Sequence, residues 1–309
     1  DPTLISEIWM GFRDEPVVAC FFSTSAENTI LMQELENAQI PAVCGAAGWY
    51  PYIPTGWTFN GYYENEPSAL NVVRWLDMPE GKEQERDMAW MKEGRKPRIG
   101  YIGWENPIGR SLLGPLFEYC KRHNIPWVGA ELTPYTFATV EAPLKRLEAN
   151  GADYVFLCMC GAGPAVVLRD AYRLKLKERG TEIIGYMGVQ DPELTLAEEA
   201  GDRTMSANGW GQPEENFPLW LKMQKVHKER TGKELTYSGV YFSGVSQGMI
   251  LYECIRILVE DKGVAPAKIT GRDIHDVLVG GELMIDAEGA YGTPLYYPNG
   301  CGVAAAHAS

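Results

Sequence analysis

The strongest constraint on the fold of this chain is the alternation of apolar runs and amphipathic stretches between residues 96 and 188. Four short apolar runs read as buried strands: Arg98–Gly103, Trp127–Leu132, Tyr154–Cys160 and Glu182–Met187. Stretches with helical spacing, ended by Asn or Gly, separate them. Parallel strands need crossover helices, so this order predicts an α/β fold with a doubly wound parallel sheet. Binding loops of such a sheet gather at the carboxyl ends of its strands.

A second series of strands begins near the N-terminus. Val17–Phe22, Ile40–Gly45 and Thr58–Tyr62 are strand candidates, and the first two flank a helical stretch. A long polar segment, Pro67–Lys92, has helical character. The chain therefore contains strands and helices enough for a second α/β lobe.

Helical spacing also predicts which residues share a face. In the central block one face is predicted to carry Leu112, Leu116, Phe117 and Cys120. Helices follow the Gly-rich passage Ser206–Gly211, at Glu214–Arg230, at Gly244–Glu260 and from Gly271 onward. The tail from residue 289 is rich in Gly, Pro and Tyr, which predicts loop structure.

The composition of the chain limits the kinds of partner that it can bind. Its 309 residues correspond to about two domains, and 45% apolar residues suffice for a sizeable core. The formal net charge of −13 argues against nucleic acid and anionic membranes as partners, because both require a basic patch. No apolar run approaches the ~18 residues of a membrane span, so we expect no membrane insertion of this segment.

Cysteine and histidine usage argues against cofactors and catalysis. The seven Cys lie mostly in apolar contexts, which predicts buried thiols rather than disulfides. Cys158 and Cys160 would face one side of a strand, but no His lies near them, so no metal is expected. His123, His227 and His275 lie in charged helical segments, typical of solvated faces. Nucleotide and hydrolase motifs are absent, and we expect no cofactor and no enzyme activity.

Two strand ends are candidate binding loops. Hydroxyls and free N–H groups between the first strand and its helix suit a carboxylate, although Ser and Thr there also serve as plain N-caps. The small residues after the second strand allow close backbone approach. The two sets are Ser23, Thr24 and Ser25, and Ala46, Ala47 and Gly48.

The order of these segments resembles the type I periplasmic solute-binding proteins, in the leucine/isoleucine/valine-binding branch that serves ABC importers. The matching passages are Pro16–Ser25, Asn37–Gly48, Pro97–Gly109, Leu147–Ala171, Thr181–Gly188 and Val240–Gly248. No single motif among them is diagnostic. The resemblance covers nearly the whole chain.

The resemblance implies two lobes joined by a three-crossing hinge that close on a small ligand. Lobe 1 would comprise residues 1–63 and 208–290, and lobe 2 residues 64–207 and 291–309. The first strand–helix–strand unit of lobe 1 is missing, so we expect the natural chain to be longer. The resemblance assigns the ligand carboxylate to Ser23, Ser25, Ala46 and Gly48. It also implies an ABC permease as partner and a periplasmic or extracellular location, with a lipid anchor upstream as an option.

One departure from the family bears on the ligand. Its amino-acid binders place Tyr, Tyr and Glu where this chain has Ile108, Cys160 and Met187. An α-ammonium group buried there would lose hydration without a counter-charge. With Trp104 and Tyr237 as further lining candidates, we expect a carboxylate or amide with an apolar or aromatic body. The alternative for Trp104 and Met187 is simple core packing.

Three other functions stay open on the sequence. A cytoplasmic amide-type sensor and a receptor ligand-binding domain would use the same fold. An α/β enzyme is the alternative from another class. A signal peptide, a membrane span or turnover of a bound ligand would separate them.

Overall fold

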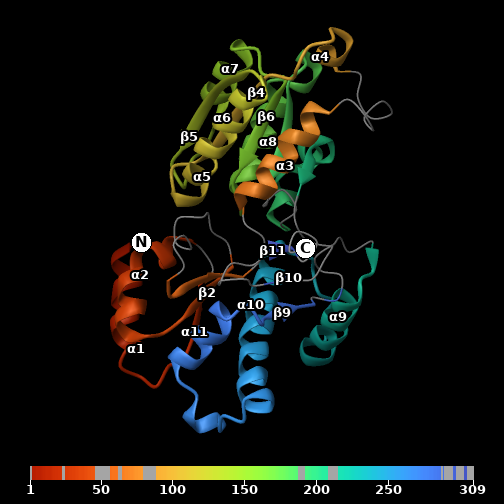
Figure 1. The fold of residues 1–309 in the computed structure, drawn as a ribbon. Helices are drawn as coiled ribbons and strands as arrows, with labels where there is room; N and C mark the ends of the chain where they lie inside the picture. The colour runs from red at the N-terminus through yellow and green to blue at the C-terminus, as the bar shows by residue number, and fades with distance from the viewer. Residues whose placement is uncertain are drawn as a thin grey trace. The chain divides into compact units, whose positions relative to one another are not determined.

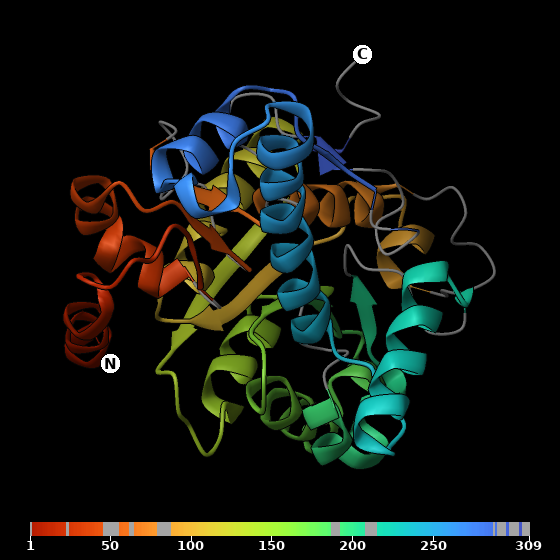
Figure 2. The same cartoon turned by 90° about the horizontal axis from the view of Figure 1, so that it is seen from below.

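The structure is a computed structural model that describes residues 2–22, 25–45, 56–61, 65–78, 88–186, 192–207, 215–286, 288, 295–296 and 303–304. The chain forms two compact units (Figures 1 and 2). Unit 1 comprises Asp1–Asn65 and Gly209–Ser309, and unit 2 comprises Glu66–Asn208. Unit 2 is therefore one continuous segment, whereas unit 1 is assembled from two.

Unit 2 is built on a parallel five-stranded sheet with the order β5-β4-β6-β7-β8. Its strands are β4 (Ile99–Trp104), β5 (Trp127–Thr133), β6 (Tyr154–Cys158), β7 (Glu182–Tyr186) and β8 (Met205–Ala207). Every residue of β4 and β6 is buried. Strands buried on both faces explain the continuous apolar runs in the sequence. The predicted α/β class is confirmed.

Helices cover both faces of this sheet (Figure 1). One face packs α7 (Glu141–Ala149), α8 (Gly163–Arg173) and the 3₁₀ segment η2 (Pro192–Arg203) against Val155 and Leu157. The opposite face packs α3 (Asn65–Asp77), α4 (Ala89–Lys92) and α6 (Leu113–Arg122) against Tyr154 and Phe156. Two short helices complete the unit, α5 (Pro107–Ser111) and η1 (Lys177–Arg179). Alternate residues of one strand thus serve two cores.

Unit 1 contains a parallel sheet with the order β1-β2-β3. Its strands are β1 (Cys20–Phe22), β2 (Ala42–Cys44) and β3 (Thr58–Asn60). A core cluster that includes Trp9 and Leu35 joins the sheet to α1 (Pro2–Phe12) and α2 (Ser25–Ala38). The further helical segments are α9 (Pro218–Thr231), α10 (Gly239–Arg256), the π-helical turn η4 (Ile257–Asp261), η5 (Pro266–Lys268) and α11 (Gly271–Val279).

The tail contains strands that the sequence did not indicate. β10 (Leu295–Tyr296) pairs antiparallel with β9 (Met284–Ile285) and with β11 (Val303–Ala304). Backbone pairing with β9 thus ties the described tail residues to unit 1, whereas the sequence resemblance places residues 291–309 in lobe 2. For the other residues of that tail the assignment stays a prediction.

Three local expectations were wrong. Residues 67–92 do not form one helix, because α3 ends at Asp77 and Met88 is extended with ψ 138°. Phe117 is 44% exposed and does not share the buried face of α6. His275 is not solvated: its ring stacks on Trp57 with 4.2 Å between centroids, and only 14% of its side chain is exposed.

The cysteines in the described part of the chain are free thiols. Four are buried, and two, Cys20 and Cys160, are half-buried. Cys158 packs in the core on the α6 side of the sheet, and Cys160 packs against the core on the α8 side. They diverge because β6 ends at Cys158, so the strand alternation that would have aligned them stops.

Candidate functional site

The carboxyl edge of the unit 2 sheet brings together three of the candidate residues. Trp104 is the last residue of β4, Ile108 lies in α5 just beyond it, and Cys160 follows β6, the strand paired with β4. Trp104 and Cys160 belong to the core on the α8 side, and Ile108 packs against the opposite core. The edge thus presents uncharged side chains from neighbouring strands.

Trp104 is held in place by the turn that follows it. Asn106 caps α5 by accepting a hydrogen bond from Gly109 N at 2.9 Å. Tyr101 lies earlier in β4, and its hydroxyl donates a hydrogen bond to Gly109 O at 2.6 Å. A Cβ at position 109 would lie 2.1 Å from the carbonyl oxygen of Trp104, so only glycine allows this approach. The backbone after β4 is therefore folded tightly onto the strand end.

The ring of Trp104 packs in the core, which is the alternative to ligand binding that the sequence left open for this residue. It is 4% exposed and packs beside Met159. Tyr135, in the loop after β5, lies over it with ring centroids 4.6 Å apart and is itself 69% exposed. An accessible aromatic ring therefore covers a buried one at this edge.

The charged groups beside this edge neutralise each other. Glu105 follows Trp104 directly, and its carboxylate accepts a hydrogen bond from Arg110 at 2.6 Å. Both side chains are more than half exposed. Glu105 therefore already forms a solvated ion pair with Arg110. It does not supply a counter-charge for the ammonium group of a buried ligand.

The carboxyl edge of the unit 1 sheet is fastened by two side chains of α10. The Gln247 amide donates to the carbonyl oxygens of Phe22 at 2.6 Å and Val43 at 3.2 Å. Ser243 Oγ donates to Gly45 O at 2.8 Å. These contacts fix the strand ends from which the two predicted binding loops depart. The sequence offered a sign of them, since Ser243 and Gln247 are polar residues spaced i, i+4 in the first half of α10.

Several candidate residues lie outside the described residues: Ser23, Thr24, Ala46, Ala47, Gly48 and Met187. Ser25 is the first residue of α2, and its side chain is not described. Their roles stay predictions.

Tyr237 lies in unit 1, just before α10. Its ring centroid is 5.4 Å from that of Phe242 and 5.8 Å from that of Trp220. It belongs to an aromatic cluster, and a part in ligand binding stays a prediction.

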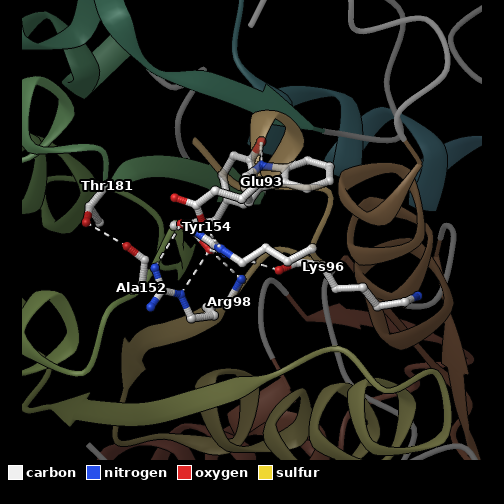
Figure 3. A network of polar contacts seen from close by, with 9 residues as sticks. Glu93, Lys96, Arg98, Ala152, Tyr154 and Thr181 are labelled. Atoms are coloured by element: carbon white, nitrogen blue, oxygen red, sulfur yellow. Dashed lines mark hydrogen bonds and ion pairs between the residues drawn. The ribbon is translucent and has the colours of Figure 1, made fainter. Parts of the chain in front are cut away.

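The polar network at the amino edge of the unit 2 sheet is structural (Figure 3). Asp153 is 5% exposed and accepts hydrogen bonds from Arg95 at 2.5 and 2.8 Å and from Arg98 N at 2.7 Å. Burial alone would raise the pKa of Asp153, but hydrogen bonds from Arg95 and Arg98 outweigh it, so the pKa is lowered. Binding loops of parallel sheets lie at the other edge, so this network anchors strands.

Within the described ranges, no three His, Cys, Asp or Glu side chains are grouped so that they could hold a metal ion. The helices of that same part of the chain include none with the length and apolarity to cross a membrane.

No protein-family model matches the chain, and no curated protein matches it. Solved structures do. A branched-chain amino acid ABC transporter protein from Thermus thermophilus with bound valine matches 99% of this chain and 81% of its own, at 18% identity and a TM-score of 0.75. A type 1 periplasmic binding protein from Bordetella pertussis matches 98% and 80%, at 14% identity and a TM-score of 0.75.

A third match is an ABC-transporter solute-binding protein from Rhodopseudomonas palustris in complex with 4-hydroxybenzoate. It matches 98% of this chain and 76% of its own, at 12% identity and a TM-score of 0.65. At these identities the matches establish the fold, which is that of type I periplasmic binding proteins. The resemblance seen in the sequence is confirmed at that level.

Proposed function

We propose that this protein is the solute-binding component of an ABC importer, acting in the periplasm or outside the cell. Its two α/β units close over a small ligand, which contacts both only in the closed form and so shifts the population toward closure. The permease then recognises the closed shape. The solved structures that share the fold support this class, since those described above are transport or binding proteins.

The ligand is a carboxylate or amide with an apolar or aromatic body rather than an α-amino acid. The observation that carries this choice is the pairing of Glu105 with Arg110 at 2.6 Å. Glu105 directly follows β4 in the sequence, and its charge is already balanced by Arg110 in water. A buried ammonium group would therefore lose hydration without compensation, at a cost of several kcal/mol.

The negative end of the ligand binds at the strand ends of unit 1. α2 begins at Ser25, shortly after β1 ends at Phe22, and its 14 residues provide a dipole whose positive end favours a carboxylate. Gln247 and Ser243 hold the carbonyl groups of the adjoining strand ends. The proposed carboxylate-binding site is completed by Ser23, Ser25 and the backbone of residues 46–48.

A thermal-shift screen tests this proposal. Benzoate, 4-hydroxybenzoate, short aliphatic carboxylates and their amides are compared with leucine and valine. At equal ligand concentration the acids are expected to stabilise most. A compound present at a hundred times its own dissociation constant should add about 2.7 kcal/mol. A larger shift with leucine or valine would contradict the ligand class, and chemical turnover of a stabilising compound would favour an α/β enzyme.

A double variant tests the carboxylate grip. Ser23→Ala with Ser25→Ala is expected to weaken binding of the best acid at least tenfold. The matched control is Thr231→Ala, which removes an exposed hydroxyl whose partner is His227 O at 2.8 Å. Unchanged affinity in the double variant would mean that the serines only cap α2.

A further inference from the structure

A hollow in unit 2 opens at the amino edge of its sheet. It lies between the second half of α8, η1, the start of β7 and the end of η2, and its volume is about 410 Å³ with its open mouth included. Sites for small organic molecules have volumes of this order. Trp104, Ile108 and Cys160 lie at the carboxyl edge of the same sheet, so the hollow is separate from the strand ends of the proposed ligand site.

The floor of the hollow is apolar. Its side chains are buried in the core on the α8 side of the sheet: Leu168, Ala171, Leu176, Ile183 and Ala200. Thr181 forms part of the wall, but its hydroxyl already donates to Ala152 O at 2.6 Å (Figure 3). Tyr172 also lines the hollow and is 40% exposed, so an aromatic side chain borders the solvent there. The hollow therefore offers an apolar surface to a small organic body.

Glu182 places a poorly compensated carboxylate in the wall. Its side chain is only 15% exposed, and the ion pair that it forms with Lys177 is loose, at 3.8 Å between Nζ and Oε1. That separation exceeds hydrogen-bond distance, and Lys177 is itself 48% exposed. A carboxylate that is largely withdrawn from water loses hydration unless a donor replaces it. Glu182 is therefore able to accept a hydrogen bond from a bound molecule.

The charges around the hollow favour a cation. Glu178 and Glu182 contribute two negative charges to the lining, and Lys177 contributes one positive charge. One ammonium group would neutralise the remaining negative charge, whereas a carboxylate would add to it. The ring of Tyr172 presents a further surface to which a cation is attracted.

We propose that this hollow is a second binding site, for a small organic amine. The apolar body of the amine packs on the floor, and its ammonium group donates a charge-assisted hydrogen bond to the carboxylate of Glu182. Primary alkylamines and arylalkylamines have this chemistry. The hollow is lined by residues of unit 2 alone, so this site does not require the two units to close, and it is independent of the proposed function.

The test compares benzylamine with benzyl alcohol, which has the same ring but no positive charge, by NMR titration of the isotope-labelled protein. Benzylamine is expected to bind with a Kd of about 1 mM, as is typical of a ligand of its size. It should bind about tenfold more tightly than benzyl alcohol, because a hydrogen bond between charged groups is worth about that factor. The largest amide shifts are expected at Ala171 and Ala200, in the floor of the hollow.

Glu182→Gln keeps the shape of the side chain but removes its charge, and it should reduce the preference for benzylamine to less than about threefold. Glu118→Gln is the matched control, because Glu118 is exposed on α6, which covers the opposite face of the sheet. The control should keep the wild-type preference. Equal losses in the two variants would mean that benzylamine responds only to the overall negative charge of the protein, and would overturn the proposal.

A second variant covers the case in which Glu182→Gln does not fold. Ala171→Leu fills part of the floor without changing any charge, and it should abolish the benzylamine-induced shift at Ala200. Thermal unfolding shows whether each variant is folded. Unchanged binding in a folded Ala171→Leu variant would count against the site. The absence of benzylamine binding to the wild-type protein, or largest shifts at residues outside the hollow, would also reject it while the proposed function stands.

Discussion

Asp153 and Arg95 form a bidentate pair across the amino edge of the unit 2 sheet, with two guanidinium nitrogens at 2.5 and 2.8 Å from the two carboxylate oxygens. Asp153 is 5% exposed, whereas Arg95 and Arg98 are 28% and 40% exposed. The carboxylate is thus the buried partner, and the arginines bring the neutralising charge from the surface. The pair joins the segment before β4 to the start of β6.

The first prediction concerns acid stability. Because the folded-state pKa of Asp153 is lowered, its contribution is complete above its unfolded pKa of about 3.9 and is lost as the pH falls through the folded value. Asp153→Asn is expected to cost about 2 kcal/mol at neutral pH, less than for a fully buried pair because both arginines remain partly hydrated. The cost should shrink below pH 4. Urea unfolding between pH 2.5 and 7 measures it.

The control for this experiment is Asp14→Asn, whose side chain is 90% exposed. It should leave the pH profile of the wild-type protein unchanged. A constant difference between Asp153→Asn and the wild-type protein at every pH would show that Asp153 acts by shape rather than by charge.

The second prediction concerns the turn after β4. Gly109→Ala would place a methyl group 2.1 Å from the carbonyl oxygen of Trp104, a backbone atom that cannot move aside. We expect a loss of about 3 kcal/mol or more in the free energy of unfolding. Gly114→Ala, only five residues away, should instead gain about 0.5–1 kcal/mol, because its methyl group meets nothing within 4 Å. Equal effects of the two alanines would contradict the described turn.

The third prediction concerns Gln247. Gln247→Met keeps the volume but removes the amide that donates to Phe22 O and Val43 O. Phe22 O still accepts from Gly45 N at 2.9 Å, so the expected cost is about 1–2 kcal/mol. Gln33→Met is the control, because the hydrogen bonds of Gln33 are exposed. Chemical denaturation measures the free energy of unfolding of both variants. A loss for Gln247→Met no larger than that for Gln33→Met would mean that the Gln247 amide does not contribute to stability.

The sequence predicted the elements whose patterns are local. Strands β4, β6 and β7 were found because their residues are almost all buried and read as unbroken apolar runs. Phe117 was wrongly predicted to be buried, because helical spacing alone does not distinguish a core residue from a partly exposed one. Its ring packs edge-on against Trp127, with 6.3 Å between the ring centroids. His275 was misread for a related reason: its charged neighbours lie on α11, but its ring packs on Trp57 from a distant segment.

The site could be predicted only in part. The position of Trp104 at a strand end followed from the βαβ order, but its close packing against Gly163, 59 residues further along, did not. The contacts of Ser243 with Gly45, just after β2, and of Gln247 with Phe22 in β1 join residues 198 and 225 positions apart. Such contacts have no local sequence pattern and emerge only when the chain is folded.

The division of the chain also bears on the order in which it folds. Unit 2 is a single stretch from Glu66 to Asn208, so all of its contacts can form without either end of the protein. Unit 1 needs both ends, and the bond between Gln247 and Phe22 closes a loop of 225 residues. Closing so long a loop costs less entropy once its middle is already collapsed. During synthesis we therefore expect unit 2 to fold first. Strands β1 to β3 are synthesised earlier, but their contacts with α10 can form only after α10 has been synthesised.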